Sequence, residues 1–333
     1  MRPFAYRRAG DIAAALRGAP ERNAGAAAFL AGGTTLVDLM KLQVMAPAVV
    51  VDINDLAQHY GSISADARTL RLGALVRMSQ AAEHQAIRRD YPMIVQSLEL
   101  AASPQLRHMA SLGGNVLQRT RCTYFRDISW KACNKRDPGS GCAALEGNNR
   151  KHAILGVSDQ CIASYPGDFA QALMAFDASV ELAGPNGSRI IPFASLHQTP
   201  GSTPQIETIL RPGELITAFV IKAAPWTRRS LFIKVRDRQS YEFALASAAV
   251  ALDLRGNVAN EARIALGGVA SKPWRAHEAE AALKGKEIKE ATAEAAATAA
   301  FSSVKTHREN KYKVDLGKRT LVRALLEAAR MKL

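Results

Sequence analysis

The chain has 333 residues, of which 48% are hydrophobic and 22% charged, a balance that is typical of globular proteins and excludes a disordered chain. The formal net charge is +14, but the cations are spread along the chain and aromatic residues make up only 6%, so the sequence argues against nucleic acid as a partner. No run of about eighteen apolar residues occurs, which excludes a membrane-spanning helix, and the opening residues lack the apolar stretch of a signal peptide. A cytoplasmic location is therefore expected.

The N-terminal region alternates short apolar strands with helical patterns, which predicts an α/β unit over residues 1–60. AAAFLAGG (26–33) predicts a strand that ends in a glycine turn. TTLVDLMKLQ (34–43) predicts the helix that follows, with Thr34 or Thr35 capping its first turn. PAVVVDIN (47–54) has consecutive β-branched residues and predicts a buried strand.

The middle region, 61–225, is predicted to be a second α/β unit with an insertion over 119–165. Ser79 is the expected N-cap of a helix, and ASLGGNVLQ is expected to form a second glycine turn over 110–118. The other predicted elements are strands at 69–76 and 213–221, helices at 91–102 and 169–178, and a hairpin at 179–193 around Pro185-Asn186-Gly187.

The C-terminal region, 228–333, has strand patterns followed by helical patterns, which predicts a small α+β domain. We expect three strands, at 230–238, 247–254 and 262–270, and then three helices, at 275–285, 290–304 and 314–332. The fold class predicted for the whole chain is α+β.

The two glycine turns, AGGTT (31–35) and ASLGGN (110–115), are candidate phosphate-binding loops. Glycine lets the backbone approach a ligand closely, and free N–H groups at a helix start favour a phosphate. Neither turn matches the Rossmann or P-loop pattern. Each turn taken alone is adequately explained as a turn, whereas the two together in a basic protein suggest a dinucleotide.

All four cysteines lie in one polar, glycine-containing segment: Cys122, Cys133, Cys142 and Cys161. Their spacing contains neither a zinc knuckle nor a ferredoxin-type run. Lysines and arginines between them, such as Arg136 and Arg150, would stabilise thiolates or an anionic cluster. Free thiols, zinc and an iron–sulfur cluster all stay open on spacing alone.

FLAGGTTLVDLMK, QLRHMASLGGN, GDFAQALMAFDA and FIKVRDR together resemble the FAD-binding subunits of the molybdenum hydroxylases, the xanthine oxidase family. The resemblance covers essentially the whole chain. It implies a vanillyl-alcohol-oxidase-type (PCMH) FAD-binding domain of two α/β subdomains, followed by a C-terminal domain of the carbon monoxide dehydrogenase flavoprotein type with a three-stranded sheet. RTRC-x-YFRD and the further cysteines are most similar to the [4Fe–4S]-containing FAD subunit of bacterial periplasmic-type aldehyde oxidoreductases.

The resemblance implies specific site residues. For FAD, the first loop would contribute Leu30, Ala31, Gly32, Gly33, Thr34, Thr35 and Leu36, and the second Ser111, Gly113, Gly114, Asn115 and Leu117. Asp168 and Lys234 would also contact FAD, and Ile216 would lie near the isoalloxazine ring. Cys122, Cys133, Cys142 and Cys161 would bind one [4Fe–4S] cluster. At 167–169 the chain has GDF where the family more often has SDL or SDM, so only the aspartate is kept.

Three of these residues also have an ordinary explanation from the sequence. Asp168 precedes a helix and is suited to be its N-cap. Ile216 fits a core position of a strand. Lys234 would be solvated if its strand lies at a sheet edge, as most lysines are.

The resemblance implies an electron-transfer subunit without catalytic acid, base or nucleophile. Its partners would be a large subunit with the molybdenum cofactor, a small subunit with two [2Fe–2S] clusters, and an external electron acceptor. Co-export with a signal-bearing partner would place the complex in the periplasm. The alternatives are a stand-alone flavin oxidoreductase of the same fold and a zinc-stapled binding protein that is not an enzyme.

Overall fold

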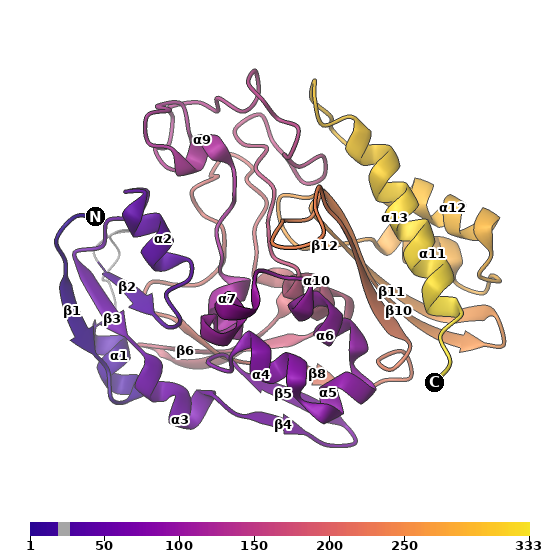
Figure 1. The fold of residues 1–333 in the computed structure, drawn as a ribbon, viewed down its shortest axis with the longest axis horizontal. Helices are drawn as coiled ribbons and strands as arrows, with labels where there is room; N and C mark the ends of the chain where they lie inside the picture. The colour runs from indigo at the N-terminus through magenta and orange to yellow at the C-terminus, as the bar shows by residue number, and fades with distance from the viewer. Residues whose placement is uncertain (19–26) are drawn as a thin grey trace.

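The computed structural model describes residues 1–18 and 27–333, so residue 26, where the predicted AAAFLAGG segment begins, lies outside it. Three β-sheets follow one another along the chain (Figure 1). Each sheet falls within one of the predicted ranges 1–60, 61–225 and 228–333. That these ranges are separate domains stays a prediction.

The first sheet is parallel, with β3 (Val49–Asp52) between β1 (Ala5–Arg8) and β2 (Ala27–Leu30). Parallel neighbours need crossover connections, which here contain helices. The helical elements of this region are α1 (Ile12–Gly18), α2 (Leu36–Lys41), η1 (Asn54–Leu56) and α3 (Ala57–Tyr60). The predicted strand at 47–54 and helix at 34–43 are confirmed by β3 and α2.

The predicted threonine cap of α2 is wrong. Thr35 occupies the N-cap position, but its side chain makes no capping hydrogen bond. Its backbone angles, φ −109° and ψ −48°, are helical, whereas a capping side chain is directed back to the helix amides from an extended backbone.

The second sheet is antiparallel, in the order β4-β5-β8-β6-β7. Its strands are β4 (Ile63–Ala65), β5 (Thr69–Gly73), β6 (Ser179–Gly184), β7 (Gly187–Pro192) and β8 (Leu215–Lys222). The helices of this region are α4 (Met78–Glu83), α5 (Gln85–Asp90), α6 (Pro92–Glu99), α7 (Pro104–Met109), α8 (Leu112–Val116), α10 (Phe169–Ala175) and η2 (Phe193–Ser195). The predicted strands, the helices at 91–102 and 169–178, and the hairpin with its turn between Gly184 and Gly187 are confirmed.

Two predictions in this region are wrong. The helix near Ser79 begins two residues earlier than expected, with Arg77 as its N-cap. The Arg77 amide donates to Gln80 Oε1 (2.9 Å), and Ser79 lies inside α4. The second glycine turn is instead the start of the short helix α8. Ser111 is its N-cap, and the Ser111 hydroxyl accepts a hydrogen bond from the Gly114 amide (3.2 Å).

The cysteine segment, residues 119–165, contains one short helix, α9 (Thr123–Arg126), between long irregular stretches. It rises at the top of Figure 1, between α2 on one side and α13 on the other. The segment is therefore largely irregular, and that it is an insertion stays a prediction.

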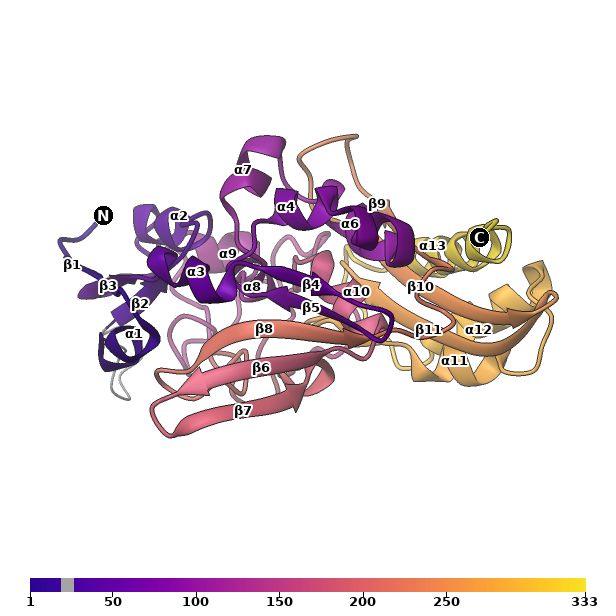
Figure 2. The ribbon, with the colours of Figure 1, turned by 90° about the horizontal axis from the view of Figure 1, so that it is seen from below.

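The C-terminal sheet is antiparallel, in the order β12-β11-β10-β9 (Figure 2). Its elements are β9 (Ser230–Val235), β10 (Ala246–Arg255), β11 (Val258–Gly267), β12 (Trp274–Arg275), α11 (His277–Leu283), α12 (Glu290–Ala300) and α13 (Tyr312–Ala329). The three predicted strands and three helices are confirmed, but the sheet has four strands rather than three, since β12 is too short to show a period in the sequence.

The C-terminal sheet is buried on both faces. Val250, Ile264 and Leu266 share a core with α11, α12 and α13 on one face. On the other face Phe232, Ala249 and Ala265 join the core of the middle region, where α6 packs against β9. The second and third sheets therefore hold α6 and α10 between them, and this packing fixes the elements that carry the candidate site.

Candidate functional site

The two glycine-rich segments of the sequence lie against one another in space. A Cβ added at Gly32 would lie 1.9 Å from the carbonyl oxygen of Met109, at the end of α7. Helix α8 is itself held on the second sheet, because the Gly113 amide donates to Ala74 O (2.8 Å). The close approach requires glycine at position 32, so the first loop and the segment before α8 form one wall.

Arg77 stabilises this wall by hydrogen bonds. Its guanidinium donates to Met109 O (2.6 Å) and to Asn54 Oδ1 (2.9 Å). Asn54 in turn donates from Nδ2 to Ala31 O (3.0 Å) in the first loop. Through Asn54, which begins η1, Arg77 thereby connects the first loop to the end of α7.

A cavity of about 370 Å³, here called the apolar pocket, opens between these segments. Side chains such as Phe29, Leu39 and Ile53 contribute its apolar walls. The sequence-predicted residues that line it are Ala31, Gly32, Gly33, Thr34, Thr35, Leu36, Ser111, Gly113, Gly114, Leu117 and Ile216. Leu30 is absent from the described lining and packs behind the loop, with its Cδ1 3.3 Å from where a Cβ of Gly33 would lie.

A second cavity of about 480 Å³, here called the polar pocket, adjoins the first and shares Thr34 and Thr35 with it. It contains the other three predicted FAD contacts, Asn115, Asp168 and Lys234. The predicted set is thus divided over two adjoining pockets, with Ile216 and Leu117 in one and Asp168 and Lys234 in the other.

Asp168 and Lys234 form a buried ion pair at the back of the polar pocket. Lys234 Nζ lies 2.6 Å from Asp168 Oδ2, and the side chains are 1% and 3% exposed. Nζ also donates to Leu100 O (3.0 Å). Burial raises the pKa of Asp168 above its ordinary value, and the Lys234 charge opposes that shift.

The structure shows the surroundings of the three residues that also had an ordinary explanation from the sequence. Asp168 does occupy the N-cap position of α10, but its side chain makes no capping hydrogen bond. Lys234 lies on β9, the edge strand of the sheet, yet its side chain is buried because α6 packs over that strand. Ile216 is 8% exposed and belongs to the core as well as to the pocket lining.

Two buried acceptor atoms belong to residues that line the polar pocket. Within the described residues, Asp168 Oδ1 and Asn115 Oδ1 have no hydrogen-bond partner. Buried polar atoms in folded proteins almost always have a partner. A ligand with donor groups would supply one, so the chemistry of this pocket suits a ligand that carries hydrogen-bond donors.

The cysteine segment contributes residues to the polar pocket that were not predicted as site residues. Arg126 Nη2 and Arg121 Nη1 lie 2.5 and 3.2 Å from Asp38 Oδ2 on α2. The Arg121 guanidinium also stacks over the Phe243 ring, 4.7 Å from its centroid. Both arginines belong to the RTRC-x-YFRD motif, so the motif signalled their presence, but the sequence could not place their partners.

The four cysteines are free thiols that come together in this segment. Cys133 and Cys142 face one another in an antiparallel bridge. Cys122 packs against two small clusters, one that contains Cys133 and one against which Cys142 also packs. The Cys142 and Cys161 thiols also interact, since each shifts the pKa of the other. Residues separated by up to 39 positions thus form one sulfur-rich neighbourhood.

The protonation of these thiols depends on their neighbours. Burial raises the pKa of Cys122 to about 12, although the Phe125 amide opposes this by pointing toward the sulfur. The hydrogen bond from Cys161 lowers the pKa of Cys142 to about 6, and amides of Ala144, Leu145 and Ile162 act in the same direction. That hydrogen bond and burial raise the pKa of Cys161.

A metal-binding geometry is not preformed here. Over residues 1–18 and 27–333, no group of three or more His, Cys, Asp or Glu side chains is arranged to hold a metal ion. The donor set is nevertheless of the kind that an iron–sulfur cluster uses, four thiols with amide N–H groups directed at the sulfurs. The four thiols therefore match an iron–sulfur cluster in the chemistry of their donor atoms, but not in their present arrangement.

Comparison with known proteins identifies the family. Residues 2–222 match the family model described as an FAD binding domain in molybdopterin dehydrogenase, and residues 232–328 match the CO dehydrogenase flavoprotein C-terminal domain. The chain therefore belongs to the FAD-binding subunits of the molybdenum hydroxylases, and its predicted α+β fold class is confirmed. In the described part of the chain, no helix has the length and apolar character needed to cross a membrane.

Several relatives resemble the chain over most of its length. The aldehyde oxidoreductase FAD-binding subunit PaoB of Escherichia coli (strain K12) is 46% identical over 98% of this chain and 99% of its own. The carbon monoxide dehydrogenase medium chain of Afipia carboxidovorans is 28% identical over 77% of this chain and 71% of its own. A solved structure of the Cu,Mo-CO dehydrogenase has a TM-score of 0.74 at 25% identity, with 99% of each chain covered.

Proposed function

We propose that the chain binds one FAD molecule across the apolar and polar pockets and is the electron-transfer subunit of a molybdenum-containing aldehyde oxidoreductase. The observation that carries the proposal is the pair of adjoining pockets that share Thr34 and Thr35. FAD has two flat ring systems joined by a pyrophosphate, which matches two pockets joined at a glycine–threonine loop. The aldehyde substrate is inferred from the 46% identity to PaoB.

The residues divide naturally between the parts of the cofactor. Gly32, Gly33, Thr34 and Thr35 would hold the pyrophosphate, since a glycine backbone permits close approach and the threonines lie where the pockets meet. The isoalloxazine ring carries a polar edge that needs hydrogen-bond partners, so we place it in the polar pocket beside Asn115 and the Asp168–Lys234 pair. The resemblance implied that Ile216 lies near the isoalloxazine ring. The placement proposed here differs, because it puts Ile216 and Leu117 against the adenine half in the apolar pocket.

FAD, when bound, accepts electrons and passes them to an external acceptor. The chain's own residues hold and shield it. The Asp168–Lys234 pair places a fixed charge pair beside the ring, while Arg121 and Phe243 close the side that faces the cysteine segment. A large partner with the molybdenum cofactor and a small partner with two [2Fe–2S] clusters would deliver the electrons, as in the family.

Cys122, Cys133, Cys142 and Cys161 are proposed to hold one [4Fe–4S] cluster. The proposal is supported by their gathering from one segment and by amides that point toward the sulfurs. Such amides stabilise the charge of bound thiolates. The cysteines would have to move from their present pairwise contacts to surround a cluster.

The test is anaerobic purification of the full chain with its two candidate partner subunits. We expect stoichiometric FAD, flavin absorption bands with a broad iron–sulfur shoulder, and aldehyde oxidation by the complex. A colourless protein with one zinc would contradict the proposal and favour the zinc-stapled alternative. Flavin-dependent turnover by the chain without partners would favour a stand-alone oxidoreductase.

A further inference from the structure

The segment between β9 and β10, residues 236–245 and here called the β9–β10 loop, forms one wall of the polar pocket. Arg238, Tyr241, Glu242 and Phe243 all line that pocket. Tyr241 adopts φ +53°, which is unfavourable for a residue with a Cβ. The Arg238 guanidinium donates to Tyr241 O (2.6 Å), and this contact helps to hold the strained turn. Such a conformation persists only where its surroundings determine it.

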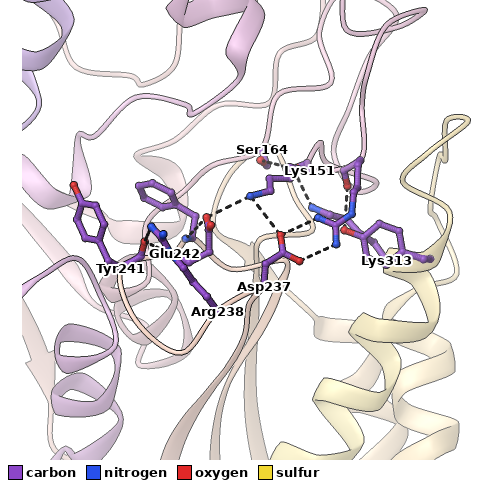
Figure 3. A network of polar contacts seen from close by, with 10 residues as sticks. Lys151, Ser164, Asp237, Arg238, Tyr241, Glu242 and Lys313 are labelled. Carbon is purple, nitrogen blue, oxygen red and sulfur yellow. Dashed lines mark hydrogen bonds and ion pairs between the residues drawn. The ribbon is translucent and has the colours of Figure 1, made fainter.

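Contacts from the cysteine segment help to hold the β9–β10 loop in this conformation (Figure 3). Arg150 forms a bidentate pair with Asp237, Nη2 to Oδ1 at 2.8 Å and Nη1 to Oδ2 at 2.9 Å. Lys151 Nζ lies 3.4 Å from Asp237 Oδ2 and 3.4 Å from Glu242 Oε1. Two adjacent cations of the segment therefore hold the loop at Asp237 and at Glu242. Planar bidentate pairs of this kind define geometry as well as charge.

The backbone that carries these cations is itself anchored to α13. The Lys313 ammonium is fully buried and donates to Lys151 O (3.0 Å) and Gly268 O (2.7 Å). The Tyr312 hydroxyl donates to Arg150 O (3.1 Å). Arg150 and Lys151 thus project from a fixed base, so their ion pairs can impose a position on the loop.

The loop also separates two cavities. A cavity of about 260 Å³ beside Cys122 and His152 lies on the cysteine side. It shares Arg121, Pro166, Glu242 and Phe243 with the polar pocket. These four residues form a partition between the cysteines and the polar pocket, and half of the partition belongs to the loop that Asp237 and Glu242 anchor.

We propose that Asp237 is a positioning residue for the flavin pocket: through Arg150 and Lys151 it ties the β9–β10 loop to the cysteine segment and so holds Phe243 and Glu242 in the partition. The inference rests on the proposed function in that it takes the polar pocket to be the flavin's. Asp237 does not line that pocket and acts through the loop. Loss of the tie should free the loop, open the partition and change the surroundings of the flavin.

The test uses the full chain purified with its cofactor, and compares D237N and R150Q with the wild type. Tryptic cleavage after the exposed Arg238 should accelerate at least about fivefold in both variants, because a protease cleaves a locally opened segment faster than a segment held in a fixed conformation. The flavin midpoint potential and visible spectrum should shift in both. The double variant should shift no further than D237N, since Asp237→Asn already removes the ion pair with Arg150. D237E should behave close to the wild type.

The matched control is D159N. Asp159 pairs with Lys305 and so also joins the cysteine segment to the C-terminal region, but it does not contact the loop. Cleavage and flavin properties of D237N that match those of D159N and the wild type would overturn the proposal. If D237N fails to fold, K151Q takes its place, and the same two measurements, tryptic cleavage and the flavin properties, test the proposal. If the wild-type chain purifies without FAD, the proposed function is refuted. Tryptic cleavage after Arg238 would still test whether Asp237 holds the β9–β10 loop.

Discussion

The ammonium of Lys234 lies 2.6 Å from Asp168 Oδ2, with both side chains almost completely removed from solvent. The pair connects β9 of the C-terminal sheet to the start of α10 in the middle region. A charge that is buried alone is very unfavourable, so each member depends on the other. The pair therefore joins two parts of the fold and lines the proposed flavin pocket at the same point.

Lys234→Met should strongly destabilise the chain. It leaves the Asp168 carboxylate buried without its counter-ion, a change that typically costs about 3–5 kcal/mol. Urea unfolding at neutral pH measures the loss, with the exposed Lys284→Met as the control. The double variant with Asp168→Asn should recover most of the stability, because no charge is then left unpaired. A single variant as stable as the control would show that the pair is not stabilising.

Gly32→Ala should weaken FAD binding. The added Cβ would meet the Met109 carbonyl at 1.9 Å, so the first loop must move away from the end of α7. Overpacking of this kind costs about 1–3 kcal/mol, which corresponds to about 5- to 140-fold weaker binding if the cost falls on the bound state. Flavin fluorescence titration measures it. Gly10→Ala is the matched control, since nothing lies within 4 Å of its Cβ. Equal affinities for the two variants would contradict the prediction.

The elements of the fold could be predicted because their signals are local, whereas the site depends on contacts between distant residues. The β6–β7 hairpin and the helices α12 and α13 follow from turn residues and periodicity alone. From the residues around it, Lys234 would be expected to be a solvated lysine on an edge strand. Its burial comes from α6, more than a hundred residues earlier in the chain, so no local pattern could show it.

The same limit applies to the cysteine segment. The sequence gathers its cysteines and cations, and the family motif indicates FAD nearby. The sequence does not show that Arg150 pairs with Asp237, 87 residues later. This pairing depends on the positions of α13 and the β9–β10 loop in the folded chain. Ser111 shows the opposite case, since a serine three residues before Gly114 is a readable N-cap signal that the glycine pair obscured.

Cys133→Ser should abolish or strongly reduce iron and acid-labile sulfide while leaving FAD content nearly unchanged. Cys133 packs with Leu39 and Phe125 and lines neither the apolar nor the polar pocket as described. Elemental analysis and the flavin spectrum of the purified complex measure the two separately. If assembly and activity also survive the loss of iron, the cluster has no required structural role. Unchanged iron content would remove Cys133 from the proposed ligands.

Lys313→Met should change how stability depends on pH. Burial first, and then the charges of Arg150 and Lys151, lower the pKa of Lys313 from 10.5 to about 7. Above pH 10.5 the amine is neutral in both the folded and unfolded chain. Between these two values the unfolded chain binds a proton that the folded chain does not, so the wild type loses stability as the pH falls. Below about 7 both states are charged and the cost stays constant.

The free energy of unfolding of the wild type should therefore rise relative to that of Lys313→Met as the pH increases from about 7 toward 10.5, by at most about 1.4 kcal/mol per pH unit. The variant leaves the carbonyls of Lys151 and Gly268 without their donor, which lowers its stability by an amount that does not depend on pH. Urea unfolding of both proteins across this range separates the two effects, with the exposed Lys311→Met as the control. A constant difference between wild type and variant would mean that the buried ammonium keeps an ordinary pKa.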